Sequence, residues 1–483
     1  MNNRLIRMAA TAIALAGAVS LTSCDPDEEY NPSQDPSEKI EAPHVSVAEG
    51  ATVDAGISTI LLTYSKPVSL NPSESVTLND AAVSASVNAE DRCIVELSVA
   101  LAPGTAYTLV VPERAAAVIG STWFAPGVTV NFSTSEAPVV PTDIQPLINP
   151  NASAQAKNVH DFLVAEYGKH ILSGAMANVN NNNDFADWLY GITAKYPAIT
   201  GYDFIHLPES GQDWIDYNDI APAKTQWQAN GLVSYMWHWR VPTDEQAWKD
   251  KDYDRWGCRV PGTDVEGPTD FDITRALTPG TWENEFILED LDKVSAVFKL
   301  LEAEGIPVLW RPLHEAAGSY KYSGAWFWWG AKGGEATKEL WKLMYDRIVN
   351  VNGVNNLIWV WTSQCEEGYY DNMAADYPGN DFVDVVGLDV YADNDESQKE
   401  AFNALKRMTD GKKLLALSET GRLQSPEKCI ADGAGWSWFN LWYTYDAHKD
   451  NPATDGFGNT AESIKAVFGS PYTINREDMP SLK

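Results

Sequence analysis

Short apolar runs alternate with helical patterns over residues 150–483, and this alternation limits the possible fold more than any other feature of the chain. Alternating strands and amphipathic helices predict an α/β fold with a parallel sheet. One intervening segment, Leu288–Glu304, has its apolar residues at helical spacing. The predicted strands are His170–Ser173, Ile199–Asp203, Leu232–Met236, Val308–Leu313, Leu357–Thr362, Val385–Asp389, Leu414–Ser418 and Trp438–Leu441. Eight strand–helix units predict a (β/α)8 TIM barrel over residues 150–483.

A chain of 483 residues is long enough for two domains, and residues 43–136 have a different pattern from the rest. Short runs rich in β-branched residues are separated there by turn signals such as Pro103-Gly104. Their spacing predicts a small all-β sandwich, and the run LAPGTAYTLVV resembles bacterial Ig-like domains. We expect a spacer, with carbohydrate binding as the alternative, because Trp123 is the only tryptophan in this segment. Residues 137–149 predict a Pro-rich linker to the barrel.

Residues 1–24 have the pattern of a secretory signal peptide, in which Arg4 and Arg7 precede an apolar stretch too short to span a membrane. The stretch ends in the sequence LTSC, which resembles a bacterial lipobox and implies a lipid on Cys24. An ordinary signal with a chance cysteine is the alternative. Residues 25–42 predict a flexible tether, and its first acidic residues are similar to surface-export signals. We therefore expect an outer membrane-anchored lipoprotein of a Gram-negative bacterium, on the cell surface or facing the periplasm.

The formal net charge of −32 argues against binding to nucleic acid, which needs a surface rich in Lys and Arg. The same charge disfavours docking on anionic lipid and suits a neutral polysaccharide. No CxxC pair, phosphate-binding loop or cluster of metal ligands is apparent in the sequence, so we expect neither a metal nor a cofactor. We also expect a monomer. The sequence does not assign a disulfide among the remaining cysteines, which are Cys93, Cys258, Cys365 and Cys429.

The candidate chemistry begins in the segment Pro307–Gly330. Its apolar run contains Arg311 and ends next to Glu315, and a Gly-rich loop with four aromatic residues follows. Barrel enzymes keep their chemistry at the C-terminal ends of the strands, and aromatic rings can stack on the apolar faces of sugars. We therefore predict an acid beside a sugar-binding cleft. The alternative is that Glu315 only pairs with Arg311 while the aromatic side chains fill the core; these are Trp326, Phe327, Trp328 and Trp329.

A second acid, Glu419, follows the apolar run Leu414–Ser418. By strand count, Glu315 ends the fourth strand and Glu419 ends the seventh, so both side chains are expected at one face of the barrel. Two carboxylates across a cleft are the minimum apparatus for breaking a glycosidic bond. For Glu419 alone, an N-cap or an ion-pair role is the alternative.

The sequence RPLHE, which ends at Glu315, and the sequence WFWWG, which begins at Trp326, resemble glycoside hydrolase family 26. The sequences GKHILSGAMA, PAITGYDF and VVGLDVYADN are similar to the same family, so the resemblance covers about residues 155–450. It implies that Glu315 is the general acid/base and Glu419 the nucleophile. It also implies hydrolysis with retention of configuration and carboxyl groups roughly 5–5.5 Å apart.

The resemblance implies further roles around the point of cleavage. His238 and His314 are expected to shape the sugar site there. His314 can do so beside Glu315 only if the strand ends in a turn or bulge, because successive strand residues point to opposite faces. Tyr391 is expected to hydrogen-bond the nucleophile and favour its ionised form.

Tryptophans complete the predicted site. Trp326 is expected beside the acid/base, and Trp442 is expected as a platform under the sugar at the cleavage point. Trp436 and Trp438 are rivals for the second role, because the register near residue 440 is open. The segment between Glu315 and Trp326 is longer than the family spacing, so another tryptophan of the cluster is the alternative for the first role.

The predicted function is that of a β-mannanase, cleaving β-1,4-mannosidic bonds in mannan, galactomannan or manno-oligosaccharides. The same fold and acids acting on xylan or mixed-linkage β-glucan are one alternative, because an aromatic cleft does not reveal whether the sugar's 2-hydroxyl is axial. A non-catalytic glycan-binding surface lipoprotein is another. The loops Asn180–Asn183 and Trp248–Phe271 are expected at the same face and bear on endo or exo action.

Overall fold

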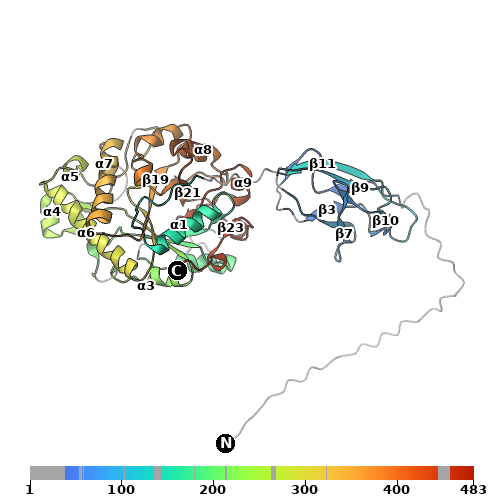
Figure 1. Cartoon of the computed structure of the whole chain (residues 1–483), viewed down its shortest axis with the longest axis horizontal. Coiled ribbons are helices and arrows are strands. Elements are labelled where there is room, and N and C mark those ends of the chain that lie inside the picture. Colours follow the sequence, from blue (N-terminus) through green and yellow to red (C-terminus); the bar gives the residue numbers. More distant parts are fainter. Residues whose placement is uncertain are drawn as a thin grey trace, which may run out of the picture. The chain divides into compact units, whose positions relative to one another are not determined.

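The computed structural model describes residues 39–483 except 54–56, 58, 103, 135–142, 179, 213–214, 263–267, 323 and 444–456. The predicted signal, the lipidation site Cys24, most of the tether and part of the linker therefore lie outside the described residues. The chain divides into two compact units, residues 1–136 and 137–483, and each is described by itself (Figure 1). No helix within the described part of the chain has the length and apolar character needed to cross a membrane.

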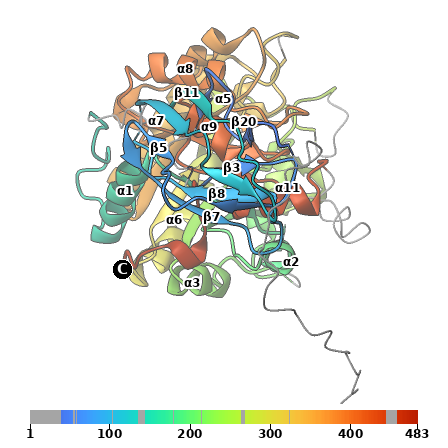
Figure 2. The same cartoon turned by 90° about the vertical axis from the view of Figure 1, so that its right-hand side faces the viewer.

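The N-terminal unit is all-β, which confirms the predicted class. One sheet has the strand order β1-β3-β8-β7, with β1 at His44–Val45, β3 at Thr59–Thr63, β8 at Ile94–Ser98 and β7 at Ser84–Val87 (Figure 2). A second sheet has the order β2-β11-β9-β5-β6, with β2 at Thr52–Val53, β11 at Val128–Thr134, β9 at Ala106–Val111, β5 at Thr77–Leu78 and β6 at Ala81–Ala82. A short pair joins β4 (Val68–Leu70) to β10 (Ala116–Val118).

The two larger sheets of this unit share one hydrophobic core. Alternate residues of β3 and β8, such as Ile60 and Val95, are fully buried and pack in one cluster with Leu109 and Phe132 of the other sheet. Alternation of this kind is what a sheet with one solvated face produces. The Ig-like assignment and the spacer role stay predictions.

The C-terminal unit contains the predicted barrel. Eight parallel strands close in the order β13-β14-β15-β18-β19-β20-β21-β22. Their bounds are Gly174–Met176, Ile199–Asp203, Leu232–Met236, Val308–Arg311, Leu357–Gln364, Val385–Val390, Leu414–Thr420 and Phe439–Leu441. Nearly every residue of these strands is buried, because helices cover one face and the barrel interior the other. This double burial explains why the strands appear in the sequence as continuous apolar runs.

The prediction for the first barrel strand was wrong by several residues. Ile171–Leu172, within the predicted run, forms β12 and pairs outside the barrel with β23 (Thr473–Ile474). The barrel strand is β13, whose sequence is Gly-Ala-Met. A Cβ at Gly174 would lie 2.6 Å from the Phe439 carbonyl oxygen, so β13 passes too close to β22 for a larger residue. Small residues selected by this close approach do not produce the apolar run that marks the other strands.

Helices lie around the outside of the barrel (Figure 1). They are α1 (Ala154–Glu166), α2 (Asp184–Thr193), α3 (Ala221–Gln228), α4 (Glu245–Asp250), α5 (Ile273–Ala276), α6 (Trp282–Ala303), α7 (Gly334–Tyr345), α8 (Lys399–Met408), α9 (Pro426–Ala431) and α11 (Ala461–Phe468). Helix α6 begins earlier than the predicted Leu288, because the Thr281 hydroxyl caps it by accepting a hydrogen bond from the backbone NH of Asn284. A two-stranded pair, β16 (Val241–Pro242) with β17 (Trp256–Gly257), lies in the connection between β15 and β18.

The register of the barrel places the C-terminal ends of several strands in one layer. Asp203 pairs with Met236, and Met236 pairs with Arg311 across β14, β15 and β18. Farther round the barrel, Asp389 of β20 lies opposite Glu419 of β21. The polar side chains at this end therefore come from strands that are distant in the sequence.

Candidate active site

Glu315 lies in a sharp turn that directly follows β18. The strand ends at Arg311, and both Leu313 (φ 51°) and Glu315 (φ 49°) then adopt left-handed backbone conformations. Residues other than glycine rarely do so, and a bulky leucine does so only when its surroundings hold it there. The turn ends the alternation of side chains along the strand, and His314 and Glu315 are both buried at this end of the barrel. The condition that the sequence set for His314 is therefore met.

Glu419 reaches the same layer through a bulge in β21. The pairing of β20 with β21 shifts after Leu388 and Leu417, so that Asp389 lies opposite Glu419 and Ser418 is the extra residue. Bulges re-aim side chains and are frequent next to active sites. The Ser418 hydroxyl donates a hydrogen bond of 2.8 Å to Asp389 Oδ1, which ties the bulge to β20.

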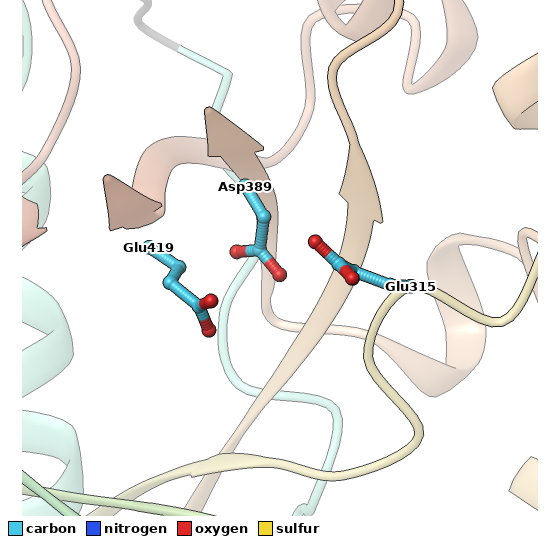
Figure 3. A group of neighbouring side chains, drawn as sticks. All are labelled: Glu315, Asp389 and Glu419. Atoms are coloured by element: carbon cyan, nitrogen blue, oxygen red, sulfur yellow. The ribbon is translucent and has the colours of Figure 1, made fainter. Parts of the chain in front are cut away.

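Three buried carboxyl groups converge at this point. One carboxylate oxygen from each of Glu315, Asp389 and Glu419 lies within 4.8 Å of the other two. In Figure 3 the Asp389 carboxylate lies between those of Glu315 and Glu419. Oxygens this close allow the Glu315 and Glu419 carboxyl groups to reach the same bond, as the carboxyl pair of a glycosidase must.

Arg311 supplies the positive charge of the cluster. Its Nη1 donates to Asp389 Oδ2 at 2.9 Å and its Nη2 donates to Glu419 Oε2 at 2.5 Å, so its ion pairs are not with Glu315. Burial opposes the guanidinium charge, but the neighbouring carboxylates outweigh it and raise the pKa of Arg311. Three carboxylates this close could hold a divalent cation by geometry alone. Two of them already share the guanidinium, so the cluster fits acid–base chemistry better than metal binding.

Glu315 and Glu419 have different surroundings. Burial, followed by the charges of Asp389 and Glu419, raises the pKa of Glu315 well above its ordinary value. Glu419 instead accepts hydrogen bonds from the Arg311 guanidinium and from the Tyr391 hydroxyl. Glu315 is thus suited to hold a proton, whereas two donors fix the position of the Glu419 side chain. Two carboxyl groups arranged in this way can act as the acid and the nucleophile of a double displacement.

Comparison with known proteins identifies the family of this chain. Residues 148–478 match the model of the family described as glycosyl hydrolase family 26. The chain belongs to glycosyl hydrolase family 26. The matched range contains both Glu315 and Glu419, and family membership confirms the resemblance that RPLHE and WFWWG indicated.

The relatives include proteins named mannan endo-1,4-beta-mannosidase. Mannan endo-1,4-beta-mannosidase B of Piromyces sp is 33% identical over 364 residues, a match that covers 73% of this chain and 57% of the relative. Mannan endo-1,4-beta-mannosidase of Thermothelomyces thermophilus is 34% identical over 340 residues, covering 69% of this chain and 63% of the relative. The chain therefore spans less than two thirds of the length of either relative.

Two solved structures match this chain over almost the whole of their own length. A β-mannanase from a symbiotic protist of the termite Reticulitermes speratus, complexed with gluco-manno-oligosaccharide, is 34% identical with a TM-score of 0.60; the match covers 70% of this chain and 99% of that one. The family 26 domain of an endo-β-mannanase/endo-β-glucanase from Prevotella bryantii is 34% identical with a TM-score of 0.60, covering 69% of this chain and 99% of that one.

The two predicted histidines and Trp442 lie together beside the family's carboxylates. The ring centroid of His238 is 4.6 Å from that of His314 and 6.0 Å from that of Trp442. His238 Nδ1 is 2.5 Å from Asp203 Oδ2, and this hydrogen bond sets the orientation of the imidazole. Burial, together with the charges of His238 and Arg311, lowers the pKa of His314 well below its ordinary value, so this imidazole is neutral.

Trp326 and Tyr391 line a cavity of about 750 Å³ that also reaches Glu315. Tyr391 is 46% exposed although its hydroxyl group bonds Glu419, so its ring forms part of the cavity wall. Burial and the charge of Glu419 raise the pKa of Tyr391, which keeps the hydroxyl a donor. The structure therefore brings both residues to the place that the sequence predicted, while their roles stay predictions.

The other aromatic residues after Glu315 do not line the cleft. Phe327, Trp328 and Trp329 are at most 1% exposed and belong to the barrel core. For these three rings the prediction of a sugar-stacking cluster was wrong, and core filling is correct. They brace the catalytic turn, because the Trp329 indole donates a hydrogen bond of 3.0 Å to the His314 carbonyl.

The rivals of Trp442 are buried elsewhere. Trp436 packs edge-on against Phe402, and its indole donates to the Ser397 carbonyl at 3.0 Å. Trp438 is 3% exposed and pairs by a backbone bridge with Leu172. Trp442 is the only one of the three within contact of His238.

Sequence reasoning assigned no role to three polar residues at this end of the barrel. Asp389 joins the carboxylate cluster, Asp203 orients His238, and Arg311 links Asp389 to Glu419. The two aspartates each end a predicted strand, as Glu315 and Glu419 do. The rule that found the glutamates could therefore have found the aspartates as well.

Proposed function

We propose that this chain is a retaining endo-β-1,4-mannanase that cleaves mannan or galactomannan. The observation that carries the proposal is the buried pair Glu315 and Glu419. One oxygen of each lies within 4.8 Å of the other, the pKa of Glu315 is raised, and the Arg311 guanidinium holds Glu419. Membership of family 26 and the names of the Piromyces and Thermothelomyces relatives support mannan as the substrate.

In the first step, Glu419 attacks the anomeric carbon while Glu315 gives its proton to the glycosidic oxygen. The bond between that carbon and oxygen breaks. The leaving chain departs as an alcohol, and the rest of the glycan stays bound to Glu419 as an ester. Arg311 and Tyr391 donate hydrogen bonds to Glu419 and hold it in position for attack.

In the second step, Glu315 is a carboxylate and acts as a base. It takes a proton from a water molecule, whose oxygen attacks the anomeric carbon and displaces Glu419. The product keeps the β-configuration, Glu315 is protonated again, and Glu419 is again ionised. His314, as a neutral imidazole, adds no competing positive charge beside the acid.

We also propose internal cleavage, which a second cavity supports. The cavity of about 750 Å³ reaches Glu315, and the second, of about 360 Å³, is lined by Gly421 and Arg422, which follow Glu419 closely in the chain. Tyr391 lines both cavities. A glycan that occupied both would extend beyond the bond that is cut in two directions, as internal cleavage requires.

The test is product analysis of the purified protein on mannan, galactomannan, xylan and mixed-linkage β-glucan, with Glu419→Gln as the inactive control. We expect manno-oligosaccharides of mixed length from the first two, and the β-anomer as the first product by NMR. Cleavage of xylan or mixed-linkage β-glucan instead of mannan would show that mannan is not the substrate. The α-anomer as the first product would exclude double displacement, and binding without any cleavage would favour the glycan-binding alternative.

We further propose that the mature protein is an outer-membrane lipoprotein anchored through Cys24 and otherwise monomeric. The LTSC sequence at the end of the signal supports the anchor. We expect labelled palmitate to be incorporated into the wild type and not into Cys24→Ser, with the wild type in the outer-membrane fraction. Protease digestion of intact cells separates a surface location from a periplasmic one, and light scattering of the soluble form measures its mass. An unlabelled wild type would exclude the anchor.

A further inference from the structure

The cavity of about 750 Å³ lies on one side of the catalytic pair. Glu315 and Trp326 line it, whereas Glu419 does not. In a double displacement the acid lies next to the departing oxygen, so the sugar that leaves must occupy the side of the acid. The cavity extends from Glu315 toward the loops after β19 and β20, where Gln364, Glu366 and Asn394 line it.

We propose that this cavity binds the leaving part of the glycan, that Gln364 accepts a hydrogen bond from one of its hydroxyl groups, and that the acidic lining selects uncharged sugars. The proposal rests on the proposed function, because it takes Glu315 as the acid. It names residues that set specificity rather than residues that make or break a bond.

The side-chain oxygen of Gln364 is a buried hydrogen-bond acceptor to which no described residue donates. The residue ends β19, is 5% exposed and lines the cavity. Its Nε2 donates to the Gly318 carbonyl, so rotating the amide would place two acceptors against each other. In this orientation Oε1 is buried with no partner among the described residues. Buried acceptors are normally paired, and a sugar hydroxyl entering the cavity can supply the missing donor.

A small hairpin next to Gln364 forms one wall of the cavity. The backbone groups of Ser319 and Gly324 exchange hydrogen bonds of 3.1 and 3.3 Å, closing the longer segment between Glu315 and Trp326. Glu366, which follows β19, holds the hairpin by two hydrogen bonds. Its Oε2 accepts from the Tyr320 backbone NH at 2.6 Å, and its Oε1 accepts from the Ser319 hydroxyl at 3.0 Å. The wall is therefore held in place before any ligand binds, which lowers the entropy lost on binding.

The charged residues that line the cavity are mostly acidic. Among the described residues that line the cavity, Lys399 is the only cationic one. The carboxylates facing it besides Glu315 and Asp389 are Glu366, Glu367, Glu396, Glu400 and Asp432. Carboxylates accept hydrogen bonds from neutral sugar hydroxyls but repel a uronate or sulfate group, and the repulsion weakens as salt screens it.

The first experiment compares two substrates in the full-length protein. Mannohexaose places sugars on the leaving side, whereas an aryl β-mannobioside places only an aryl group there. For Gln364→Met and for Glu366→Gln we expect the ratio of kcat/KM for mannohexaose to kcat/KM for the aryl substrate to fall about tenfold. The second variant keeps Gln364 intact, so the test stands even if Gln364→Met folds poorly.

Matched controls come from outside the site. Gln226 is also a buried glutamine whose Nε2 contacts backbone carbonyls, and Glu477 also accepts from a backbone NH, that of Tyr196. Gln226→Met and Glu477→Gln should leave the ratio unchanged. An unchanged ratio in both cavity variants would overturn the leaving-side assignment while leaving the proposed function intact. A wild type inactive on both substrates would overturn the proposed function and this inference with it.

The second experiment tests the charge selection. Oxidising the reducing end of mannotetraose gives an aldonate with a carboxylate on the leaving side, and reducing it gives an alditol of the same length without charge. We expect the aldonate to be cut about tenfold more slowly than the alditol at low salt, with the difference shrinking as salt is added. Equal rates at low salt would overturn selection for uncharged sugars.

Discussion

The ends of β18 and β21 carry the same type of residue and prepare it for opposite tasks. After β18 the chain turns through two left-handed residues and leaves Glu315 buried near two other carboxylates. At the end of β21 a bulge aims Glu419 at Arg311 and Tyr391, which donate hydrogen bonds to it. The backbone thus decides which partners each glutamate meets.

Burial affects a carboxyl group differently according to the hydrogen-bond donors around it. Both glutamates are buried, with exposed fractions of 8% and 5%. Burial without a donor raises the pKa of a carboxyl group, whereas burial with a paired guanidinium supports its charge. Exposure alone would therefore not have distinguished the acid from the nucleophile.

Removing Glu419 should have the largest effect. In Glu419→Gln we expect kcat on mannan to fall by about 10⁴-fold or more, because the amide cannot serve as the nucleophile that forms the covalent intermediate. Circular dichroism and the melting temperature should stay close to wild type. Glu477→Gln, which lies outside the site, is the matched control, and retention of more than a tenth of the wild-type rate would remove Glu419 from its proposed role.

Replacing Arg311 should have the next largest effect, and we expect it to lower the free energy of unfolding. Arg311→Met leaves the buried carboxyl groups of Asp389 and Glu419 without the cation that they share, which costs about 3–5 kcal/mol by analogy with other broken buried ion pairs. Denaturant unfolding of the barrel measures it. Adding Asp389→Asn to this variant should restore part of the stability without restoring activity. Additive losses in the double variant would show that Arg311 and Asp389 do not act as a pair.

Glu315 should matter in proportion to the leaving group. In Glu315→Ala we expect about 10²–10³-fold loss on mannan, whose leaving alcohol needs a proton, and a much smaller loss on a dinitrophenyl β-mannobioside. Adding azide should speed the variant with the activated substrate, because a small anion can replace water in the second step. Equal losses on both substrates would contradict the role of acid.

The pH dependence follows from the raised pKa of Glu315. The acid must keep its proton, so kcat/KM should fall as pH rises through that pKa, and this limb should vanish in Glu315→Gln with the activated substrate. Above its ordinary pKa the unfolded chain loses the proton that the folded protein still holds, so Glu315 lowers stability as pH rises. Glu315→Gln should therefore raise the melting temperature by a few degrees at pH 7 and less at pH 4. A larger gain at pH 4 would contradict the direction of the shift.

Tyr391 should show the smallest effect. Tyr391→Phe removes one of the two donors to Glu419 and keeps the ring, so we expect about a tenfold loss in kcat with little change in KM. Tyr190→Phe on the outer helix α2 is the control. A loss confined to KM would make Tyr391 a binding residue that does not assist the nucleophile.

The barrel was predictable because strands covered on both faces appear as apolar runs, and the acids were predictable because each follows such a run. The first strand was missed because Gly174 and its neighbours are small for a packing reason that the sequence pattern does not contain. The raised pKa of Glu315 was also beyond the sequence, since it depends on burial and on Asp389 and Glu419 meeting Glu315 across the barrel. Likewise, nothing in WFWWG distinguishes Trp326 in the cleft from Trp328 and Trp329 in the core.

The link between Arg311 and Glu419 joins residues 108 positions apart in the chain. As a ribosome releases the chain, Arg311 and Glu315 emerge long before the two carboxylates that complete the cluster. Until β20 and β21 pair with the rest of the barrel, the Arg311 guanidinium lacks its two carboxylate partners and stays hydrated. The appearance of activity during synthesis should therefore report the closing of the barrel itself, and truncations ending before residue 420 should yield no partial enzyme.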